Sequence, residues 1–377
     1  MWNKIKAFAS DRLYPIFFVP REVASKGTRL FFLDGFRSVA LLLMVASHGL
    51  KTWIHPAFET PVSIYFKLLI NKIPAPMFFF LVGASYVLSR DARLRRGMTR
   101  QQVLFSFARR SLVLFALAFV YKLMDALFGV PLRYIRWWEI DVLNIIALSL
   151  FLIAWLDYAT RTLKNSHRLH LIAALVGVTL TPLLFKIHFP AGFPNLLRLY
   201  IQGTQAECAW FTLLPYACYT FFGAWMVQGF VNGTIQKPFL NLHLVSLLLL
   251  SCMGLGQLLP RLAPDPWIRE CGLSLFYFSR AFLLLSLGVY GAHLFQRFVG
   301  FGPFLIIGAY TMLGYWVHAK VVYLYYKPHI GAETWAGSFL LLLKVYAMTF
   351  AAVFAWSEFK KWRKRKKKAA AAMAVGS

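Results

Sequence analysis

Long runs of hydrophobic residues alternate with short polar and basic stretches along most of the chain. About ten of these runs approach the ~20 residues that a helix needs to cross the hydrocarbon core of a bilayer. They are Phe36 to Trp53, Ile73 to Leu88, Ser111 to Gly129, Trp138 to Leu156, Leu169 to Ile187, Ala209 to Gly229, Leu242 to Leu259, Leu273 to His293, Pro303 to Tyr325 and Trp335 to Trp356. The pattern predicts an all-α, polytopic membrane protein with about ten transmembrane helices.

Lysine and arginine are concentrated in alternate connections between these runs. They occur in the N-terminal segment, between Arg90 and Arg110, between Arg161 and Arg168, and from Lys360 to Lys368. Short cytoplasmic loops of membrane proteins are enriched in these residues. All four basic stretches fall on one side of the membrane if both termini are cytoplasmic, and this topology is the one we predict.

The composition agrees with a membrane protein and argues against two other classes. Of 377 residues, 59% are hydrophobic and 15% are charged, and the mean hydropathy is +0.59. The net charge of +27 could suggest a nucleic-acid partner. That interpretation needs a basic face on a soluble fold, whereas these cations lie mostly in loops and tails, so we expect no nucleic acid. The four cysteines have no C-x-x-C spacing, and we expect no metal site.

The chain is expected to form one membrane domain, residues 33–356, flanked by two cytoplasmic segments. Residues 1–32 lack the apolar core and cleavage site of a signal peptide, so we expect an amphipathic segment on the membrane surface. Residues 357–377 form a basic tail that should lie against anionic lipid headgroups. Its last residues, AAAAMAVGS, are typical of a cloning remnant.

The stretch LDGFRSVALLLMVASHGLKTWIH, Leu33 to His55, carries the most informative polar residues. Arg37 and His48 are eleven residues apart, close to three helical turns, so both should project from one face of a helix, ~16 Å apart along its axis. A histidine on an otherwise apolar helix favours a functional role over packing. We therefore expect an anion at Arg37 and chemistry at His48. His55 is a secondary candidate, because Pro56 suggests that the helix ends there.

Several other ionisable residues map to the predicted outer half of the membrane. They are Lys122, Asp125, Glu139, Asp141, Arg280 and His318. Ionisable groups within a bilayer are costly and usually face a partner or a watery cavity, which suggests a polar vestibule open to the outside. Simpler explanations remain open for four of these residues. Lys122 and Asp125, spaced i, i+3, could neutralise one another, Arg280 could reach lipid headgroups, and His318 could donate to a backbone carbonyl.

Five segments resemble the membrane-bound acyltransferases. The LDGFR…H segment resembles the first core helix of acyltransferase family 3, and APMFFFLVGASYVLSR resembles the second helix of the heparan-α-glucosaminide N-acetyltransferase-like proteins. The segments WEIDVLNIIALSL, TLLPYACYTFFGAWM and LGYWVHAKVVYLYY follow in the order of the fourth-helix, mid-chain and late segments of these proteins. The resemblance extends from about Leu30 to Tyr326. It departs from the pattern at Tyr216, where a tryptophan is usual, and in the shortness of the extracytoplasmic loops.

The resemblance implies transfer of an acyl group, most simply acetyl, from cytoplasmic acyl-CoA to an extracytoplasmic glycan or lipid-linked sugar. The phosphates of coenzyme A are suited to arginine clusters. The candidates for this site are Arg37, Arg90, Arg93, Arg96, Arg109 and Arg110. His48 would deprotonate the hydroxyl or amine of the acceptor, or accept the acyl group itself. Asp141 or Asp125 would orient this imidazole, and His318 or Arg280 would stabilise the oxyanion. Arg280 and Lys122 would bind the acceptor, and His55 stays a secondary catalytic candidate.

Two other classes of function remain open from the sequence. A secondary transporter or flippase for a lipid or a small polar substrate would also have about ten spans, but it is expected to show repeated halves and matching broken helices, and none are evident. An assembly protein without chemistry would not need Arg37 and His48 together. We expect a multi-pass protein of the bacterial cytoplasmic membrane, in contact with membrane lipids and capable of forming a homo-oligomer.

Overall fold

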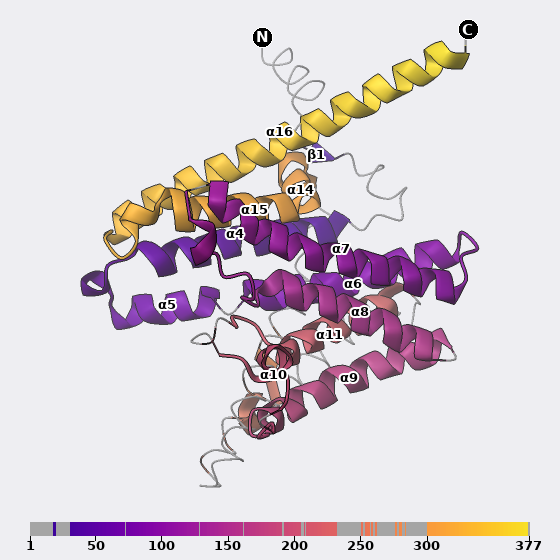
Figure 1. Ribbon diagram of the computed structural model, residues 1–377, viewed down its shortest axis with the longest axis horizontal. Coiled ribbons are helices and arrows are strands. Elements are labelled where there is room, and N and C mark those ends of the chain that lie inside the picture. The colour runs from indigo at the N-terminus through magenta and orange to yellow at the C-terminus, as the bar shows by residue number, and fades with distance from the viewer. Residues whose placement is uncertain are drawn as a thin grey trace, which may run out of the picture. The chain divides into compact units, whose positions relative to one another are not determined.

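The computed structural model describes residues 18–19, 31–71, 73–127, 129–160, 162–190, 192–204, 207, 209–231, 250–251, 253–256, 258, 261, 276, 279–280, 283 and 300–375. The chain divides into two compact units, Met1–Pro74 with Val289–Ser377, and Ala75–Gly288. Helices make up nearly all of the described secondary structure (Figure 1). The only described strands, β1 (Phe18–Val19) and β2 (Gly300–Phe301), form one short antiparallel pair. The predicted all-α class is therefore confirmed.

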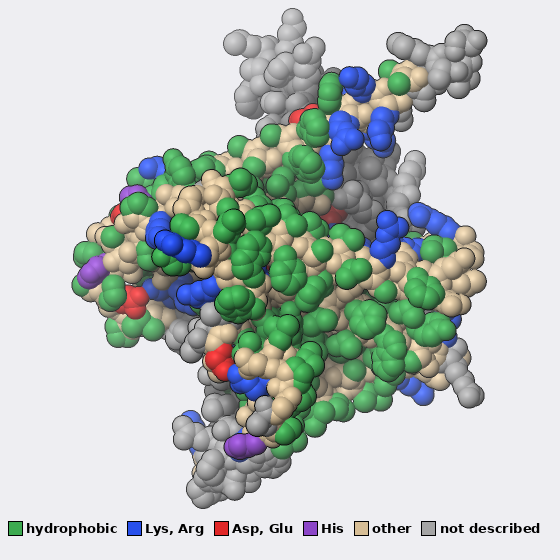
Figure 2. Space-filling view, viewed as in Figure 1, with side chains coloured by type: hydrophobic (Ala, Val, Ile, Leu, Met, Phe, Trp, Pro, Cys, Tyr) green, Lys and Arg blue, Asp and Glu red, His purple; other side chains and the backbone are tan. Residues whose placement is uncertain are grey.

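Four helices in the described part of the chain are long and apolar enough to cross a membrane. They are Leu33–Trp53, Arg100–Leu127, Val142–Ala159 and Trp335–Lys367. On the second of these, Phe105 is 63% exposed, Leu112 69% and Leu127 80%. Figure 2 shows hydrophobic side chains over much of the visible face. An apolar surface of this extent is expected where a protein faces lipid. Two predicted spans, Leu242 to Leu259 and Leu273 to His293, lie largely outside the described residues.

The first unit is organised around the helix that carries Arg37 and His48. Besides β1 and β2, its described elements are α4 (Phe31–Trp53), η2 (Pro56–Phe58), α5 (Pro61–Asn71), α14 (Gly302–Ala309), α15 (Thr311–Lys320), η5 (Val321–Tyr325), η6 (Lys327–His329) and α16 (Trp335–Val375). Helix α4 packs against α5, α14, α15 and α16. A Cβ atom at Gly308 would lie 1.9 Å from the carbonyl oxygen of Asp34, so only glycine permits this approach of α14 to α4.

Backbone hydrogen bonds attach the C-terminal end of α4 to the segment that leads into α16. The amides of Gly331 and Glu333 donate to the carbonyls of Thr52 and Trp53, each at 2.9 Å. The amide of His55 donates to the carbonyl of Glu333, also at 2.9 Å. These bonds hold the end of the His48 helix in a defined position.

The second unit is a set of helices that cross at small residues. It contains almost all of α6 (Pro74–Leu94), together with α7 (Arg100–Leu127), η3 (Leu132–Tyr134), α8 (Val142–Ala159), α9 (Leu163–Leu184), α10 (Asn195–Gln202) and α11 (Leu213–Val231). A Cβ atom at Gly83 would lie 1.8 Å from the carbonyl oxygen of Thr220, and one at Gly223 would lie 2.1 Å from that of Phe80. The two glycines thus let α6 and α11 approach closely, as small residues do in membrane helix pairs.

The ends of the helices agree with the predicted spans in some places and differ in others. Helix α4 ends at Trp53, as predicted, but begins before Phe36. The predicted span from Pro303 to Tyr325 is divided: α14 ends at Ala309, α15 begins at Thr311, and η5 is π-helical. Hydropathy alone predicts one helix here because all three pieces are apolar.

Candidate functional site

Arg37 and His48 lie on one continuous helix, as the sequence predicts. Nη1 of Arg37 lies 2.6 Å from Oδ1 of Asp34, one turn earlier on α4. The Asp34 side chain is 4% exposed and that of Arg37 is 25% exposed. Asp34 therefore holds a partly accessible guanidinium near the N-terminal end of α4.

The structure brings together two of the predicted site residues, His48 and His318. Nδ1 of His48 on α4 lies 3.1 Å from Nε2 of His318 on α15. The two rings are stacked, with centroids 5.2 Å apart. His318 is completely buried, whereas His48 is half-buried. The pair joins residues that are 270 positions apart in the sequence.

The hydrogen-bond partners of His318 and His48 determine which ring nitrogen of His48 keeps an unshared lone pair. Nδ1 of His318 lies 2.9 Å from the carbonyl oxygen of Gly314, which can only accept, so this nitrogen carries the hydrogen. In the neutral ring Nε2 of His318 must then accept, and Nδ1 of His48 donates to it. Neutral His48 consequently carries its lone pair on Nε2, for which no partner occurs among the described residues. An imidazole oriented in this way can act as a base or a nucleophile.

A third aromatic residue, Tyr323, lies against His48 and was not recognised from the sequence. Their ring centroids are 5.5 Å apart, and Tyr323 forms a side-chain hydrogen bond with Thr52. Tyr323 belongs to the π-helical turn η5, directly after α15. Such turns occur frequently at functional sites, because they change which residues a helix presents.

His55 lies beyond the end of α4 and performs a local structural task. It is exposed, and its Nδ1 accepts a hydrogen bond of 3.1 Å from the amide of Ala57, which caps η2. Its ring also contacts Phe58.

Four more of the candidate residues belong to the second unit. Lys122, buried on α7, donates to the carbonyls of Glu139 and Trp137. Asp141 caps the N-terminus of α8, accepting from the amides of Leu143 and Asn144. Asp125 is half-buried on α7. Arg280 lies over the ring of Phe276, 5.9 Å from its centroid. Asp141 thus caps the N-terminal end of α8, and Lys122 joins α7 to the connection that precedes α8.

The candidate phosphate-binding arginines of the second unit differ in accessibility. Arg90 is 2% exposed and ion-paired, and the guanidinium of Arg93 lies 4.5 Å from the ring centroid of Phe107. Arg96, Arg109 and Arg110 are exposed. Only the last three present an accessible guanidinium to a solute without rearrangement.

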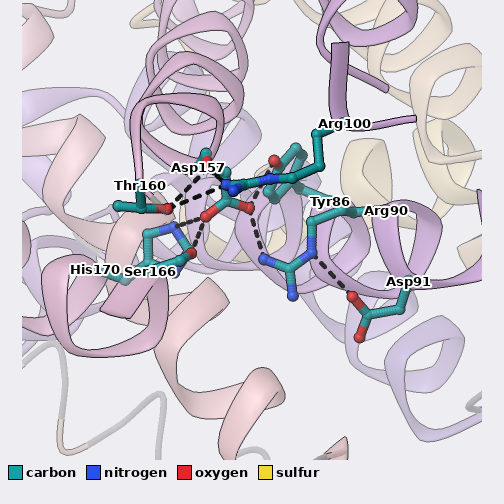
Figure 3. Close-up of polar contacts among 8 residues, drawn as sticks. All are labelled: Tyr86, Arg90, Asp91, Arg100, Asp157, Thr160, Ser166 and His170. Carbon is teal, nitrogen blue, oxygen red and sulfur yellow. Dashed lines mark hydrogen bonds and ion pairs between the residues drawn. The ribbon is translucent and has the colours of Figure 1, made fainter. Parts of the chain in front are cut away.

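A buried polar cluster surrounds Asp157 in the second unit and was not recognised from the sequence (Figure 3). Its carboxylate accepts from the Tyr86 hydroxyl at 2.7 Å and from Nη1 of Arg90 at 2.5 Å. It also accepts from the Ser166 hydroxyl and lies 3.0 Å from Nε2 of His170. Asp157 is the only acidic residue in the apolar run of α8, and that isolation is the signal that could have identified it.

The Asp157 cluster connects four helices. Tyr86 and Arg90 lie on α6, Asp157 on α8, and Ser166 and His170 on α9. Arg100, at the start of α7, donates to the carbonyl of Asp157. The Asp157 side chain is 5% exposed and that of Arg90 is 3% exposed, so the charges compensate each other away from water. The cluster therefore joins the ends of these four helices through hydrogen bonds and an ion pair.

Residues 29–259 match the model of a protein family, the catalytic domain of heparan-alpha-glucosaminide N-acetyltransferase. The chain belongs to this family. The matched region includes Arg37, His48 and the Asp157 cluster, and it ends before His318. No curated protein matches the chain closely. Family membership confirms the resemblance to these acyltransferases and, with the apolar helices, indicates a membrane acetyltransferase.

Proposed function

We propose that the protein transfers an acyl group, most simply acetyl, from cytoplasmic acyl-CoA to a hydroxyl or amine of an extracytoplasmic glycan or lipid-linked sugar. Membership of the acetyltransferase family supports the reaction class. The observation that carries the proposal is the hydrogen-bonded series His48, His318 and Gly314, which orients an imidazole on a membrane helix.

In this proposal Nε2 of His48 removes the proton of the acceptor as its oxygen or nitrogen attacks the thioester carbonyl. The new bond to the carbonyl carbon forms, the carbon–sulfur bond breaks, and the proton passes from His48 to the departing thiolate of CoA. His318 accepts from Nδ1 of His48 and stabilises the imidazolium that forms transiently. Transfer through an acyl-histidine would use the same nitrogen, because Nε2 carries the lone pair.

We propose two separate groups of candidate ligands for the CoA phosphates, Arg37 on the first unit and the exposed Arg96, Arg109 and Arg110 on the second. A guanidinium group can bind two phosphate oxygens at once. Arg90 and Arg93 are weaker candidates, because the first is buried against Asp157 and the second covers Phe107. This distinction is tested by measuring the KM for acyl-CoA in single alanine variants.

We keep five polar residues as candidates for assisting catalysis or binding the acceptor. They are His55, Lys122, Asp125, Asp141 and Arg280. The readout for each is the KM for the acceptor in a variant that still folds. We also propose about ten spans with both termini cytoplasmic, and a place in the bacterial cytoplasmic membrane. The four described apolar helices and the basic stretches between predicted spans support this topology.

The donor site is tested by thermal unfolding of the detergent-solubilised protein with acetyl-CoA, CoA and dephospho-CoA. A ligand at a hundred times its dissociation constant adds about 2.7 kcal/mol to the free energy of unfolding. We expect CoA species to raise the unfolding temperature of the wild type and to have little effect on Arg37→Ala. The absence of any shift at millimolar acetyl-CoA would remove the main support for an acyltransferase.

The assigned base is tested by acetyl transfer from labelled acetyl-CoA to amino sugars and hydroxyl-bearing sugars. His48→Ala should lower kcat by at least about 10²- to 10⁴-fold, and His318→Gln should lower kcat by less, because His318 only orients the base. His188→Ala is the matched control, because His188 is exposed on the second unit and bonds only the carbonyl of Lys186 among described residues. Full activity of a folded His48→Ala protein would exclude the assigned base.

A further inference from the structure

The last helix, α16, is longer than a bilayer requires. Its candidate span, Trp335–Lys367, has 33 residues, which at ~1.5 Å per residue extend roughly 50 Å. The hydrocarbon core is only ~30 Å thick, and ~40–45 Å with the headgroup layers included. The C-terminal part of α16 also continues past α14 and α15, and Figure 1 shows this extension. Residues from about Trp356 onward therefore fall at or beyond the headgroup layer.

Three aromatic side chains of this part of α16 each hold a cation four residues later. Lys360 lies 5.6 Å from the ring centroid of Trp356, Arg363 lies 5.9 Å from that of Phe359, and Lys366 lies 5.5 Å from that of Trp362. The three aromatic residues are 42%, 43% and 55% exposed, in the same order. Cation–π contacts at such exposed positions are individually weak. The three contacts repeat along one helix, however, and so place their three cations on the same side of it.

These residues occupy one side of the helix, which we call the aromatic–basic face. It consists of Trp356, Phe359, Lys360, Trp362, Arg363, Lys366 and Lys367. At 3.6 residues per turn the seven positions fall within roughly 160° of arc. Lys361, Lys364 and Arg365 lie on the other side, where Nζ of Lys361 is 2.5 Å from the carboxylate of Glu358. All of these cations are exposed, and Figure 2 shows Lys and Arg gathered toward this end of α16.

We propose that the aromatic–basic face is a binding surface for anionic phospholipid headgroups. Tryptophan rings are suited to the membrane interface, and anionic lipid headgroups attract basic residues that lie beside a bilayer. The rings hold Lys360, Arg363 and Lys366 on the side of the helix that meets the headgroups. A basic segment that is only solvated would not need its aromatic residues and cations on the same face.

The contacts of α16 connect this surface to the rest of the first unit. The hydroxyl of Tyr346 on α16 donates to the carbonyl of Leu42 on α4 at 2.7 Å. Lys360 also lies 5.0 Å from the ring centroid of Tyr310, between α14 and α15. Lipid bound at the aromatic–basic face would thus hold α16 against the helices that carry His48 and His318. The proposal does not depend on the proposed reaction, since lipid binding is measured without substrate.

Two triple variants that remove equal charge from opposite sides of α16 test the proposal. R363Q/K366Q/K367Q alters the aromatic–basic face, and K361Q/K364Q/R365Q alters the other side. Binding of the full-length solubilised protein to phosphatidylglycerol and phosphatidylcholine is measured by native mass spectrometry and by lipid titration. We expect the first variant to lose affinity for phosphatidylglycerol by about tenfold or more, and the second by less than about threefold. Thermal unfolding confirms that both variants fold.

A third variant, F359A/W362A, keeps every charge and should also weaken binding, because it removes the rings that orient the cations. Equal losses in the two triple variants would overturn the proposal by showing that only net charge matters. Equal affinity of the wild type for the two lipids would also overturn it. Tighter binding of a single-stranded oligonucleotide than of phosphatidylglycerol vesicles would assign the surface to nucleic acid instead.

Discussion

Replacing Asp157 by asparagine should be the most destabilising conservative change in the Asp157 cluster. The carboxylate accepts from Tyr86, Arg90 and Ser166 and lies beside His170. Asparagine has nearly the same shape and keeps one accepting oxygen. It removes the negative charge, however, and can turn an N–H group toward the guanidinium of Arg90. The buried arginine is then left without its principal counter-charge.

The burial of the pair sets the expected magnitude. The side chains of Asp157 and Arg90 are 5% and 3% exposed, so water cannot replace the missing partner. Breaking a buried ion pair by removing one partner costs about 3–5 kcal/mol. We therefore expect Asp157→Asn to lower the free energy of unfolding by that amount, measured by chemical or thermal unfolding in detergent. Asp157→Leu combined with Arg90→Met should recover part of the loss, because no unpaired buried charge remains.

Glu207→Gln is the matched control for this prediction. It is also a carboxylate-to-amide change in the second unit, but Glu207 pairs with Arg198 at the surface, where their side chains are 35% and 30% exposed. Such pairs contribute less than about 1 kcal/mol. If Asp157→Asn costs no more than Glu207→Gln, the Asp157 cluster does not stabilise the unit and our reasoning fails.

Two further predictions concern packing and pH in the second unit. Gly83→Val should prevent the close approach of α6 to α11, because its Cβ would lie 1.8 Å from the carbonyl oxygen of Thr220. Gly192→Val is the control, because a Cβ atom at Gly192 has no atom within 4 Å. We expect lower expression and a lower unfolding temperature for Gly83→Val than for Gly192→Val. Hydrogen bonding to Arg198 and Thr204 lowers the pKa of Glu207 below its ordinary value. The small stability from this carboxylate is therefore present above the ordinary glutamate pKa of ~4.3 and is lost as the pH falls through the lowered pKa. Glu207→Gln should remove that part of the acid dependence of unfolding, and an unchanged acid dependence would contradict the prediction.

The α-helical membrane class and the main helix of the first unit could be predicted from the sequence. A bilayer requires every backbone polar group in a spanning segment to be satisfied within that segment, so an apolar run such as Phe36 to Trp53 can scarcely be anything but a helix. Helical periodicity then places Arg37 and His48 on one face without any knowledge of neighbouring helices. The order of the short motifs was sufficient for the family, which the match over residues 29–259 confirms.

The partners of the polar side chains could not be predicted in the same way. His48 and His318 are 270 positions apart in the sequence, and Arg90 and Asp157 are 67 positions apart. No local sequence pattern encodes pairings over such distances. Arg90 and Arg96 look alike within one basic stretch of sequence, yet the first is buried in an ion pair and the second is exposed. Hydropathy records which segments leave water, whereas the neighbour of each polar group depends on which helices pack together. Only the tertiary structure shows which helices pack together. The missing side chains of Gly83, Gly223 and Gly308 make three of these close contacts possible.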